Sequence, residues 1–292
     1  MNKKYYLAAL HKIWLTHKNL FDLFSDNYDY DKVYNSLDYK LLSNFNLSDL
    51  KISKILKNKK DLDFSDLIEK IDNLWVEIIT FYENNYPEEL KNIFNPPYVL
   101  YIRWNIKLPW ISFIGSRMMT FYWKKIIEKF VPDIWKHFTI ISWWAIWCDT
   151  YSHQIALKNN IPTISVFWTW IDISYPSSNK KMYEDIIVKW WALISIFPLW
   201  EKWFSYNFPI RNEIVAWLSK WVFIVEAKEK SWTMITSKLA LDLWKDLFCV
   251  AWDIFKTTSW GCNKLISSWE AKFVFQLDDV LNEYNIYSET KI

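Results

Sequence analysis

Glycine is almost absent from this chain, which has two glycines in 292 residues. Average usage is about 7% glycine, so about twenty would be expected in a chain of this length. Tight turns and left-handed helix ends favour glycine, because other residues enter the positive-φ region at a cost. The chain also has 22 tryptophans, so the two residue types together come close to a normal glycine count.

Cysteine, histidine and long apolar runs are also scarce. The three cysteines (Cys148, Cys249 and Cys262) show no CxxC spacing, which argues against a disulfide framework or a zinc site and favours a reducing cytoplasm. Met1 to Leu10 lacks the apolar region of a signal peptide, and no run approaches the roughly 18 apolar residues of a membrane span. We therefore expect a cytoplasmic protein with no membrane partner, metal or cofactor.

Charge and hydrophobic content leave several functions open. The net charge of +2 neither requires nor excludes a nucleic-acid partner, because a local basic groove can lie on a nearly neutral protein. The hydrophobic content of 52% is sufficient for one large domain or two small ones.

Tryptophan stands where elements end. Trp244 follows the helical run TMITSKLALDL and precedes the strand-like DLFCVA, and Trp269 follows NKLISS and precedes AKFVF. Both are positions at which a helix ends in a left-handed residue, usually glycine. Other tryptophans occupy similar helix-to-strand or strand-to-turn positions: Trp143, Trp144, Trp147, Trp168, Trp170, Trp190 and Trp191.

We interpret most or all of the tryptophans as glycines, encoded by a UGA codon that the organism reads as glycine and a different codon table reads as tryptophan. The alternative is a tryptophan-rich sugar or single-strand binder with stacking platforms. Stacking residues should cluster on one surface and not at the ends of many elements, so we favour the first interpretation.

The pattern of apolar residues changes near residue 73. Residues 1–72 form short amphipathic segments, which predict a small helical module. Its segment Ile13 to Thr16, IWLT, is either the glycine turn of a helix-hairpin-helix module or, as we favour, a simple helix connection. Residues 73–292 alternate short apolar strands with helices. This alternation predicts an α/β domain with a parallel, doubly wound sheet, which binds ligands beyond the carboxyl ends of its strands.

The stretch PWISFIGSR, Pro109 to Arg117, is the first candidate site. An apolar run ends at Gly115, and Ser116 and Arg117 follow directly. A buried strand, a glycine turn and a helix start present backbone N–H groups to an anion, usually a phosphate. The alternative is an ordinary turn with a surface arginine.

Two further stretches could bind phosphate. Arg211 and Asn212 follow a proline at a predicted helix start in NFPIRNEIVAW, where an arginine can contact phosphate in a bidentate manner. Ser231, Trp232 and Thr233 open a helix as SWT, or SGT in the glycine reading. The alternative for Arg211 is a salt bridge to a carboxylate.

A loop and a helix carry weaker signals. The loop WTWIDISYPSSN precedes a predicted helix, and we expect Ser177 or Ser178 to cap that helix. Lys180 follows the loop directly and is either a phosphate ligand or part of a solvated face. Asp149 and His153 are either an acid/base pair or, as we favour, a helix cap and a buried histidine that satisfies a partner. No known catalytic motif is present, so we expect a binder of a long phosphate-bearing ligand and not an enzyme.

Read with glycine for tryptophan, the chain resembles the DNA-processing protein A family (DprA, also called Smf) over about residues 75–275. The resemblance rests on an ordered series of blocks: NYPEEL with NPPYVLYIRW, FIGSR, ISWWAIWCD with His153, WTWID with YPSSN, NFPIRNEIVAWLS, VEA, SWTMIT, and WGCNKLI with SSWEA.

The resemblance implies an extended Rossmann-like sheet that binds single-stranded DNA, with no known catalytic cycle. It implies that the protein loads the RecA recombinase and displaces single-strand-binding protein during transformation and recombination, and that it forms a homodimer through about Leu239 to Val250. By matching position, the DNA phosphate site contains Gly115, Ser116, Arg117, Asn179, Lys180, Arg211, Asn212, Ser231, Trp232 and Thr233.

The chain departs from the family pattern at three places. Cys148 replaces the usual aliphatic residue before Asp149, and Ile196 stands where an acidic residue precedes Phe-Pro. A winged-helix-like extension found in many relatives has no counterpart, so we do not expect a double-strand contact. The alternative is a Rossmann-like nucleotide-handling enzyme such as a nucleoside-monophosphate phosphoribohydrolase, but KSWTMITS lacks the proline and the glutamate of that family's PGGxGTxxE loop.

Overall fold

The computed structural model describes most of the chain as two compact units. The described residues are 2–24, 29–103, 109–116, 120–134, 137–143, 148–167, 169–171, 173, 177–189, 191–199 and 207–284, with the backbone alone for 207–212. The first unit comprises Met1–Trp104, Thr169–Ile173 and Ile194–Lys202, and the second comprises Asn105–Trp168, Ser174–Leu193 and Trp203–Ile292. The boundary that we expect after residue 72 therefore does not coincide with the limit of the first unit, which extends to Trp104.

The first unit begins with short helices, as the amphipathic segments predict. Asp63 caps α6 by accepting hydrogen bonds from the Ser65 and Asp66 amides, both at 3.0 Å, and such caps satisfy N–H groups that a helix start leaves unpaired. Strands β1 (Val76–Thr80) and β2 (Val99–Arg103) then pair antiparallel. The helices are α1 (Lys4–Lys12), α2 (His17–Phe24), α3 (Tyr30–Ser36), α4 (Tyr39–Ser43), α5 (Asp49–Asp61), α6 (Phe64–Asn73) and α7 (Glu88–Lys91).

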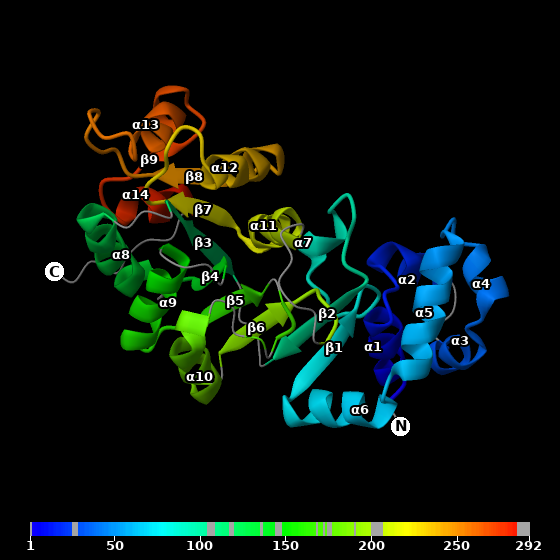
Figure 1. The fold of residues 1–292 in the computed structure, drawn as a ribbon. Helices are drawn as coiled ribbons and strands as arrows, with labels where there is room; N and C mark the ends of the chain where they lie inside the picture. Colours follow the sequence, from blue (N-terminus) through cyan, green and yellow to red (C-terminus); the bar gives the residue numbers. More distant parts are fainter. Residues whose placement is uncertain are drawn as a thin grey trace. The chain divides into compact units, whose positions relative to one another are not determined.

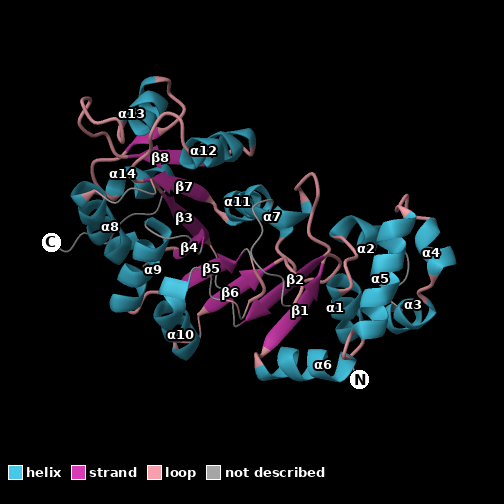
Figure 2. Ribbon diagram, viewed as in Figure 1, coloured by secondary structure: helices cyan, strands magenta, loops and turns pink. Residues whose placement is uncertain are grey.

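The second unit is built on strands that lie in the order β5-β4-β3-β7-β8-β9, and the next strand of the sheet, β6, is divided between the two units after Leu193 (Figures 1 and 2). All pairings from β5 through β9 are parallel, which confirms the predicted α/β class. The strands are β3 (Trp110–Ile114), β4 (Thr139–Trp143), β5 (Thr163–Phe167), β6 (Ala192–Ser195), β7 (Trp221–Ile224), β8 (Asp246–Cys249) and β9 (Lys272–Phe273).

Helices connect these strands. They are α8 (Phe121–Ile134), α9 (Cys148–Lys158), the 3₁₀ turn η1 (Ser177–Asn179), α10 (Lys180–Val188), α11 (Asn207–Leu218), α12 (Trp232–Asp242), α13 (Trp260–Ser267), α14 (Asp278–Leu281) and η2 (Asn282–Tyr284). Helices α8 and α9 lie on one face of the sheet and α11 and α12 on the other (Figure 1). Among the residues that the structure describes, no helix has the length and hydropathy to cross a bilayer.

The strand order reverses at β3. From β3 the chain moves outward through β4 and β5 to β6, and it then returns to place β7 on the other side of β3. Open α/β sheets bind ligands at such a switch point, in the crevice beyond the carboxyl ends of the strands. The β3 strand ends at Ile114, so the turn at Gly115 occupies the switch point.

A buried core holds β3 and β7 in place. Phe113 and Phe223 are fully buried on these neighbouring strands, and their rings stack at 4.9 Å. Burial of each such ring contributes about 1.5–3 kcal/mol. Trp123, Ile127 and Phe130 of α8 pack in the same cluster. The turn at the end of β3 therefore starts from a rigid strand.

Candidate functional site

The turn after β3 is hydrogen-bonded to the end of β7. The Val225 amide donates to the Ile114 carbonyl oxygen at 3.0 Å, and the Ser116 amide donates to the Glu226 carbonyl oxygen at 2.8 Å. These bonds continue the β3–β7 pairing past both strand ends. The Ser116 N–H is therefore already used within the protein, and Ser116 is buried. Arg117, the third residue of the predicted turn, lies outside the described residues.

Gly115 is required by close packing and not by its φ angle. A Cβ atom at Gly115 would lie 2.9 Å from Cys148 Sγ and 3.2 Å from Cys148 Cβ, and neither described glycine has a positive φ. Cys148 is the first residue of α9. The glycine thus lets the N-terminus of α9 approach the end of β3, and a helix N-terminus favours anions.

The first turn of α9 joins two of the predicted site segments. Cys148 packs against Gly115, and two residues later the Thr150 hydroxyl accepts a hydrogen bond from Asn179 Nδ2 at 3.0 Å. Asn179 is buried at the N-cap of α10, and the adjacent Lys180 is exposed. The cap expected at Ser177 or Ser178 is wrong: both lie in η1, because this 3₁₀ turn delays the start of the helix to Lys180.

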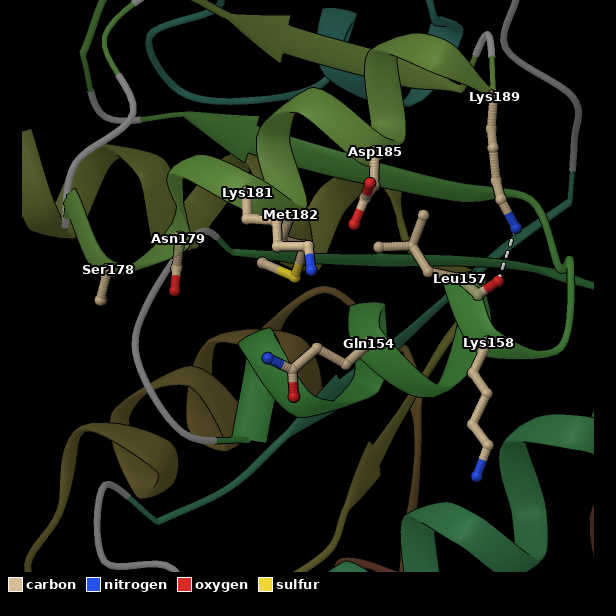
Figure 3. A pocket seen from close by; sticks show the side chains of 9 residues that line it. All are labelled: Gln154, Leu157, Lys158, Ser178, Asn179, Lys181, Met182, Asp185 and Lys189. Atoms are coloured by element: carbon tan, nitrogen blue, oxygen red, sulfur yellow. Dashed lines mark hydrogen bonds between the residues drawn. The ribbon is translucent and has the colours of Figure 1, made fainter.

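Asn179 also lines a groove of about 530 Å³ between α9 and α10 (Figure 3). Lys189 closes one end, where its Nζ donates to the Leu157 carbonyl oxygen at 2.7 Å. Lys158 and Lys181 line the same groove, and neither forms an ion pair with a described residue. The groove therefore runs from Asn179 along α9 to its last residue, Lys158, and the Asp185 carboxylate lines it beside the lysines, so its charge is mixed.

The predicted helix start at Ser231, Trp232 and Thr233 is confirmed. Ser231 is the N-cap of α12, and its hydroxyl oxygen accepts a hydrogen bond from the Met234 amide at 3.4 Å. Thr233 is buried, whereas the indole of Trp232 is 45% exposed at the helix N-terminus. A cavity of about 450 Å³ lies beside this helix start and is also lined by Lys230 and Lys238. The indole ring of Trp232 therefore lies at the first residue of α12. If residue 232 is glycine, no side chain is present there and the backbone is open to a ligand.

Glu226 is the residue of this region that sequence reasoning left out of the site. It is 1% exposed, its Oε2 accepts the Thr120 hydroxyl at 2.9 Å, and its Oε1 has no hydrogen-bond partner among the described residues. Burial raises the pKa of Glu226, and the neighbouring Thr258 and Thr120 hydroxyls oppose that rise. The signal in the sequence is the carboxylate that ends the apolar strand VFIVEA.

Arg211 and Asn212 lie in α11, on the side of the sheet opposite α9, but their side chains lie outside the described residues. The predicted turn tryptophans Trp144, Trp147, Trp168 and Trp190 also lie outside them. The structure therefore links Gly115 and Asn179 through contacts with the first turn of α9. Ser231 to Thr233 follow β7 at the start of α12. The contacts of Arg117 and Arg211 remain predictions.

His153 has a structural environment. It is fully buried, with Nδ1 2.7 Å from the Thr163 hydroxyl oxygen and Nε2 3.1 Å from the Ser165 hydroxyl oxygen. Burial lowers the pKa of His153 to about 4, so the ring is neutral at physiological pH. The Asp149 carboxylate accepts a hydrogen bond from the Ser142 hydroxyl at 3.1 Å. The favoured expectation that His153 satisfies buried partners is confirmed.

The cysteines are buried and unpaired. Burial raises the pKa of the Cys148 and Cys249 thiols, which keeps them protonated and poorly reactive. Within the described ranges, no group of three or more histidine, cysteine and acidic side chains is arranged to hold a metal ion.

The reversed strand order, the close-packed glycine turn at β3 and the helix starts beyond the sheet edge define an extended Rossmann-like α/β protein with a ligand edge at its switch point. Residues 77–285 match the model of the DNA recombination-mediator protein A family, and the chain belongs to this family. The family resemblance predicted from the sequence is confirmed.

Several relatives agree with this assignment. The DNA processing protein DprA of Streptococcus pneumoniae is 33% identical over 202 residues, which cover 68% of this chain and 71% of the relative. DprA of Bacillus subtilis is 31% identical over 213 residues, which cover 71% of each chain.

Solved structures extend the similarity to the fold. The X-ray structure of DprA from Streptococcus pneumoniae superposes with a TM-score of 0.79 and 26% identity and covers 97% of this chain and 98% of that one. DNA processing protein A from Helicobacter pylori, described for its single-stranded DNA binding mode, gives a TM-score of 0.63 with 26% identity, over 72% of this chain and 96% of that one.

Proposed function

We propose that this protein binds single-stranded DNA and acts as a recombination mediator. The observation that carries the proposal is the glycine turn at the switch point, where the N-terminus of α9 approaches the end of β3 and reaches Asn179. Membership of the recombination-mediator family and the single-stranded DNA binding mode of the Helicobacter pylori relative support it.

In this proposal the sheet edge holds the DNA backbone and the protein makes no covalent change to it. Arg117 and Arg211 supply charged, bidentate contacts to phosphate, while Lys180, Asn179 and the hydroxyls of Ser116, Ser231 and Thr233 position the strand. The protein then loads the RecA recombinase as a cytoplasmic homodimer that pairs through about Leu239 to Val250. The family resemblance supports these last steps, which require neither cofactor nor catalysis.

Equilibrium binding of a fluorescent single-stranded oligonucleotide tests the proposal. Loss of one phosphate contact in Arg117→Ala or Arg211→Ala should weaken binding by about ten- to a hundredfold, since a charged hydrogen bond contributes about 1.5–3 kcal/mol and 1.4 kcal/mol is tenfold in affinity. Lys70→Ala is the matched control, because it also removes one positive charge, but one on α6 of the first unit that is paired with Asp66 at 2.9 Å. Binding that is unaffected by both arginine changes would count against the proposal, and release of a base from a nucleotide would instead favour a phosphoribohydrolase.

We also propose that the printed tryptophans are glycines in the native protein. Four of the six described non-glycine residues with positive φ are tryptophans: Trp14, Trp75, Trp244 and Trp269. Trp244 and Trp269 are 96% and 95% exposed, so no packing of the indole offsets the unfavourable backbone. Trp170 and Trp221 are instead fully buried, and the indole N–H of each has no hydrogen-bond partner among the described residues. A buried N–H without a partner is unfavourable.

The stability of Trp244 variants tests whether the backbone at that position requires glycine. Trp244 has φ 57°, and a Cβ in the left-handed region costs about 1–2 kcal/mol. Both Trp244→Gly and Trp244→Ala remove the indole, but only glycine removes the Cβ. Urea unfolding should show the glycine variant more stable than the alanine variant by about 1 kcal/mol; an alanine variant of equal or greater stability would contradict the assignment.

Intact mass spectrometry of the native protein tests the recoding itself. Each tryptophan-to-glycine exchange makes a large mass difference, so a native mass matching the printed sequence would exclude the exchange.

A further inference from the structure

Two exposed phenylalanines lie on segments that are tied to the switch-point turn. Phe121, the first residue of α8, is 73% exposed, and Phe255, in the loop between β8 and α13, is 86% exposed. Exposed aromatic rings have an unfavourable contact with water that folding usually removes.

Hydrogen bonds connect Phe121 to the switch-point turn. The preceding residue, Thr120, donates its hydroxyl to Glu226 Oε2 at 2.9 Å, and the Glu226 carbonyl oxygen accepts the Ser116 amide at 2.8 Å. Phe121 is thus one residue away from a side chain that contacts the end of β7. Phe121 therefore begins α8 directly after a residue that is hydrogen-bonded to Glu226.

The loop that carries Phe255 is held against the same end of α8. Tyr122 donates its hydroxyl to the Ala251 carbonyl oxygen at 3.1 Å, a contact that does not depend on any tryptophan. The loop follows β8, which pairs parallel with β7, so it leaves from the same carboxyl edge of the sheet. Both segments that present exposed rings therefore meet beside the turn.

The turn that carries the exposed Phe255 ring is held by hydrogen bonds to Asp253. The Phe255 amide donates to Asp253 Oδ1 at 2.9 Å, and the Lys256 amide donates to the Asp253 carbonyl oxygen at 3.1 Å. These bonds order the backbone around a side chain that remains in solvent. An ordered loop loses little conformational entropy when its ring meets a ligand.

Lysines accompany both rings. Lys125 Nζ lies 4.7 Å from the centre of the Phe121 ring, and Lys256 follows Phe255 directly and is exposed. Neither lysine forms an ion pair with a described residue. Cations interleaved with exposed aromatic rings are the arrangement by which proteins hold single strands, since each base has a π-face and each nucleotide a phosphate.

We infer that Phe121 and Phe255 form a base-stacking platform for the single strand whose phosphates occupy the adjacent turn. This inference rests on the proposed function and adds a site for the bases to a site for the backbone. A second copy of the chain fits this surface less well, because a two-fold contact centred here would bring Lys125 and Lys256 toward their own copies. None of Phe121, Tyr122 and Phe255 is a tryptophan, so the platform residues are the same in either reading of the sequence.

Two oligonucleotides of equal length test the platform, one of thymidines and one abasic, with the full chain made in the form whose mass matches the native protein. Both carry the same phosphates, and only the first can stack. We expect the thymidine strand to bind at least about fivefold more tightly, and Phe121→Leu or Phe255→Leu to reduce this preference about fivefold while leaving abasic binding unchanged. Phe255→Tyr, which keeps a ring, should retain the preference.

The outcomes separate the platform from the proposed function. Equal affinity for both strands, or equal loss of both in the leucine variants, would overturn the platform while leaving phosphate binding intact. Failure to bind either strand would instead remove the proposed function. Light scattering adds the third test: a change of oligomeric state in Phe255→Leu would assign the surface to a second copy of the chain and overturn the platform.

Discussion

Acidification from pH 7 to pH 4 should remove about 3 kcal/mol of stability through His153 alone. Burial lowers the pKa of His153 from 6.5 to about 4, and each pKa unit corresponds to about 1.4 kcal/mol. The folded protein binds this proton less well than the unfolded chain. The contribution is therefore fully present above pH 6.5 and disappears as the pH falls through 4.

A variant isolates this contribution from the carboxylates that also titrate. His153→Gln loses some stability at pH 7.5 because its contacts with Thr163 and Ser165 change, but its unfolding free energy should fall less steeply between pH 6.5 and pH 4 than that of the parent. Urea unfolding across this range measures both slopes. Parallel slopes would show that the buried ring does not drive acid unfolding of the second unit.

The first unit contains a second acid-sensitive element. The rings of His11 and His17 lie 4.7 Å apart, and Nδ1 of His11 is 3.0 Å from the Tyr101 hydroxyl oxygen. Burial lowers the pKa of His17 to about 4, and burial together with the neighbouring His17 lowers the pKa of His11. Charging either ring opposes charging the other, so the same direction of pH dependence applies to the helical unit.

Gly261→Ala should lower the free energy of unfolding by about 3 kcal/mol, the upper end of the usual cost of overpacking. A Cβ at Gly261 would lie 2.7 Å from the Ala227 carbonyl oxygen and 2.9 Å from Met234 Sδ. The Gly261 amide donates to that carbonyl at 2.8 Å, so the backbone cannot move away without losing the bond. Urea unfolding at pH 7 measures the loss.

Gly115→Ala provides a matched comparison, because its nearest obstacle is the Cys148 side chain and not a backbone atom. Cys148→Ala should restore part of the stability that Gly115→Ala removes, since it deletes the Sγ that lies 2.9 Å from the new Cβ. A Gly261→Ala protein as stable as the parent would mean that α13 packs less closely on the β7–α12 connection than the structure shows.

Local patterns predicted the architecture because they act over a few residues. Alternation of short apolar runs with helical periodicity predicted the parallel sheet, and the run NKLISS before Trp269 predicted a left-handed helix end, found at φ 61°. The hydroxyls at Ser231 and Thr233 predicted the start of α12. Each of these features depends on hydrogen bonds within one element or its cap.

The arrangement of the site depended on partners distant in the sequence. Ser116 bonds to Glu226, 110 positions later, so no local pattern around Ser116 could predict that its N–H is already used. The requirement for Gly115 comes from contact with Cys148 on another element. The extension of the first unit beyond residue 72 likewise results from the pairing of β1 with β2, a tertiary contact.

The salt dependence of single-stranded DNA binding tests the central claim most directly. Each phosphate contact contributes a slope of about −0.7 to the plot of log affinity against log salt for a single strand. We predict steep weakening with salt for the parent, and a slope smaller by about 0.7 in Arg117→Ala and in Arg211→Ala but unchanged in Lys70→Ala. A salt-independent affinity, or identical slopes in all four proteins, would contradict the assignment of this sheet edge to DNA phosphates.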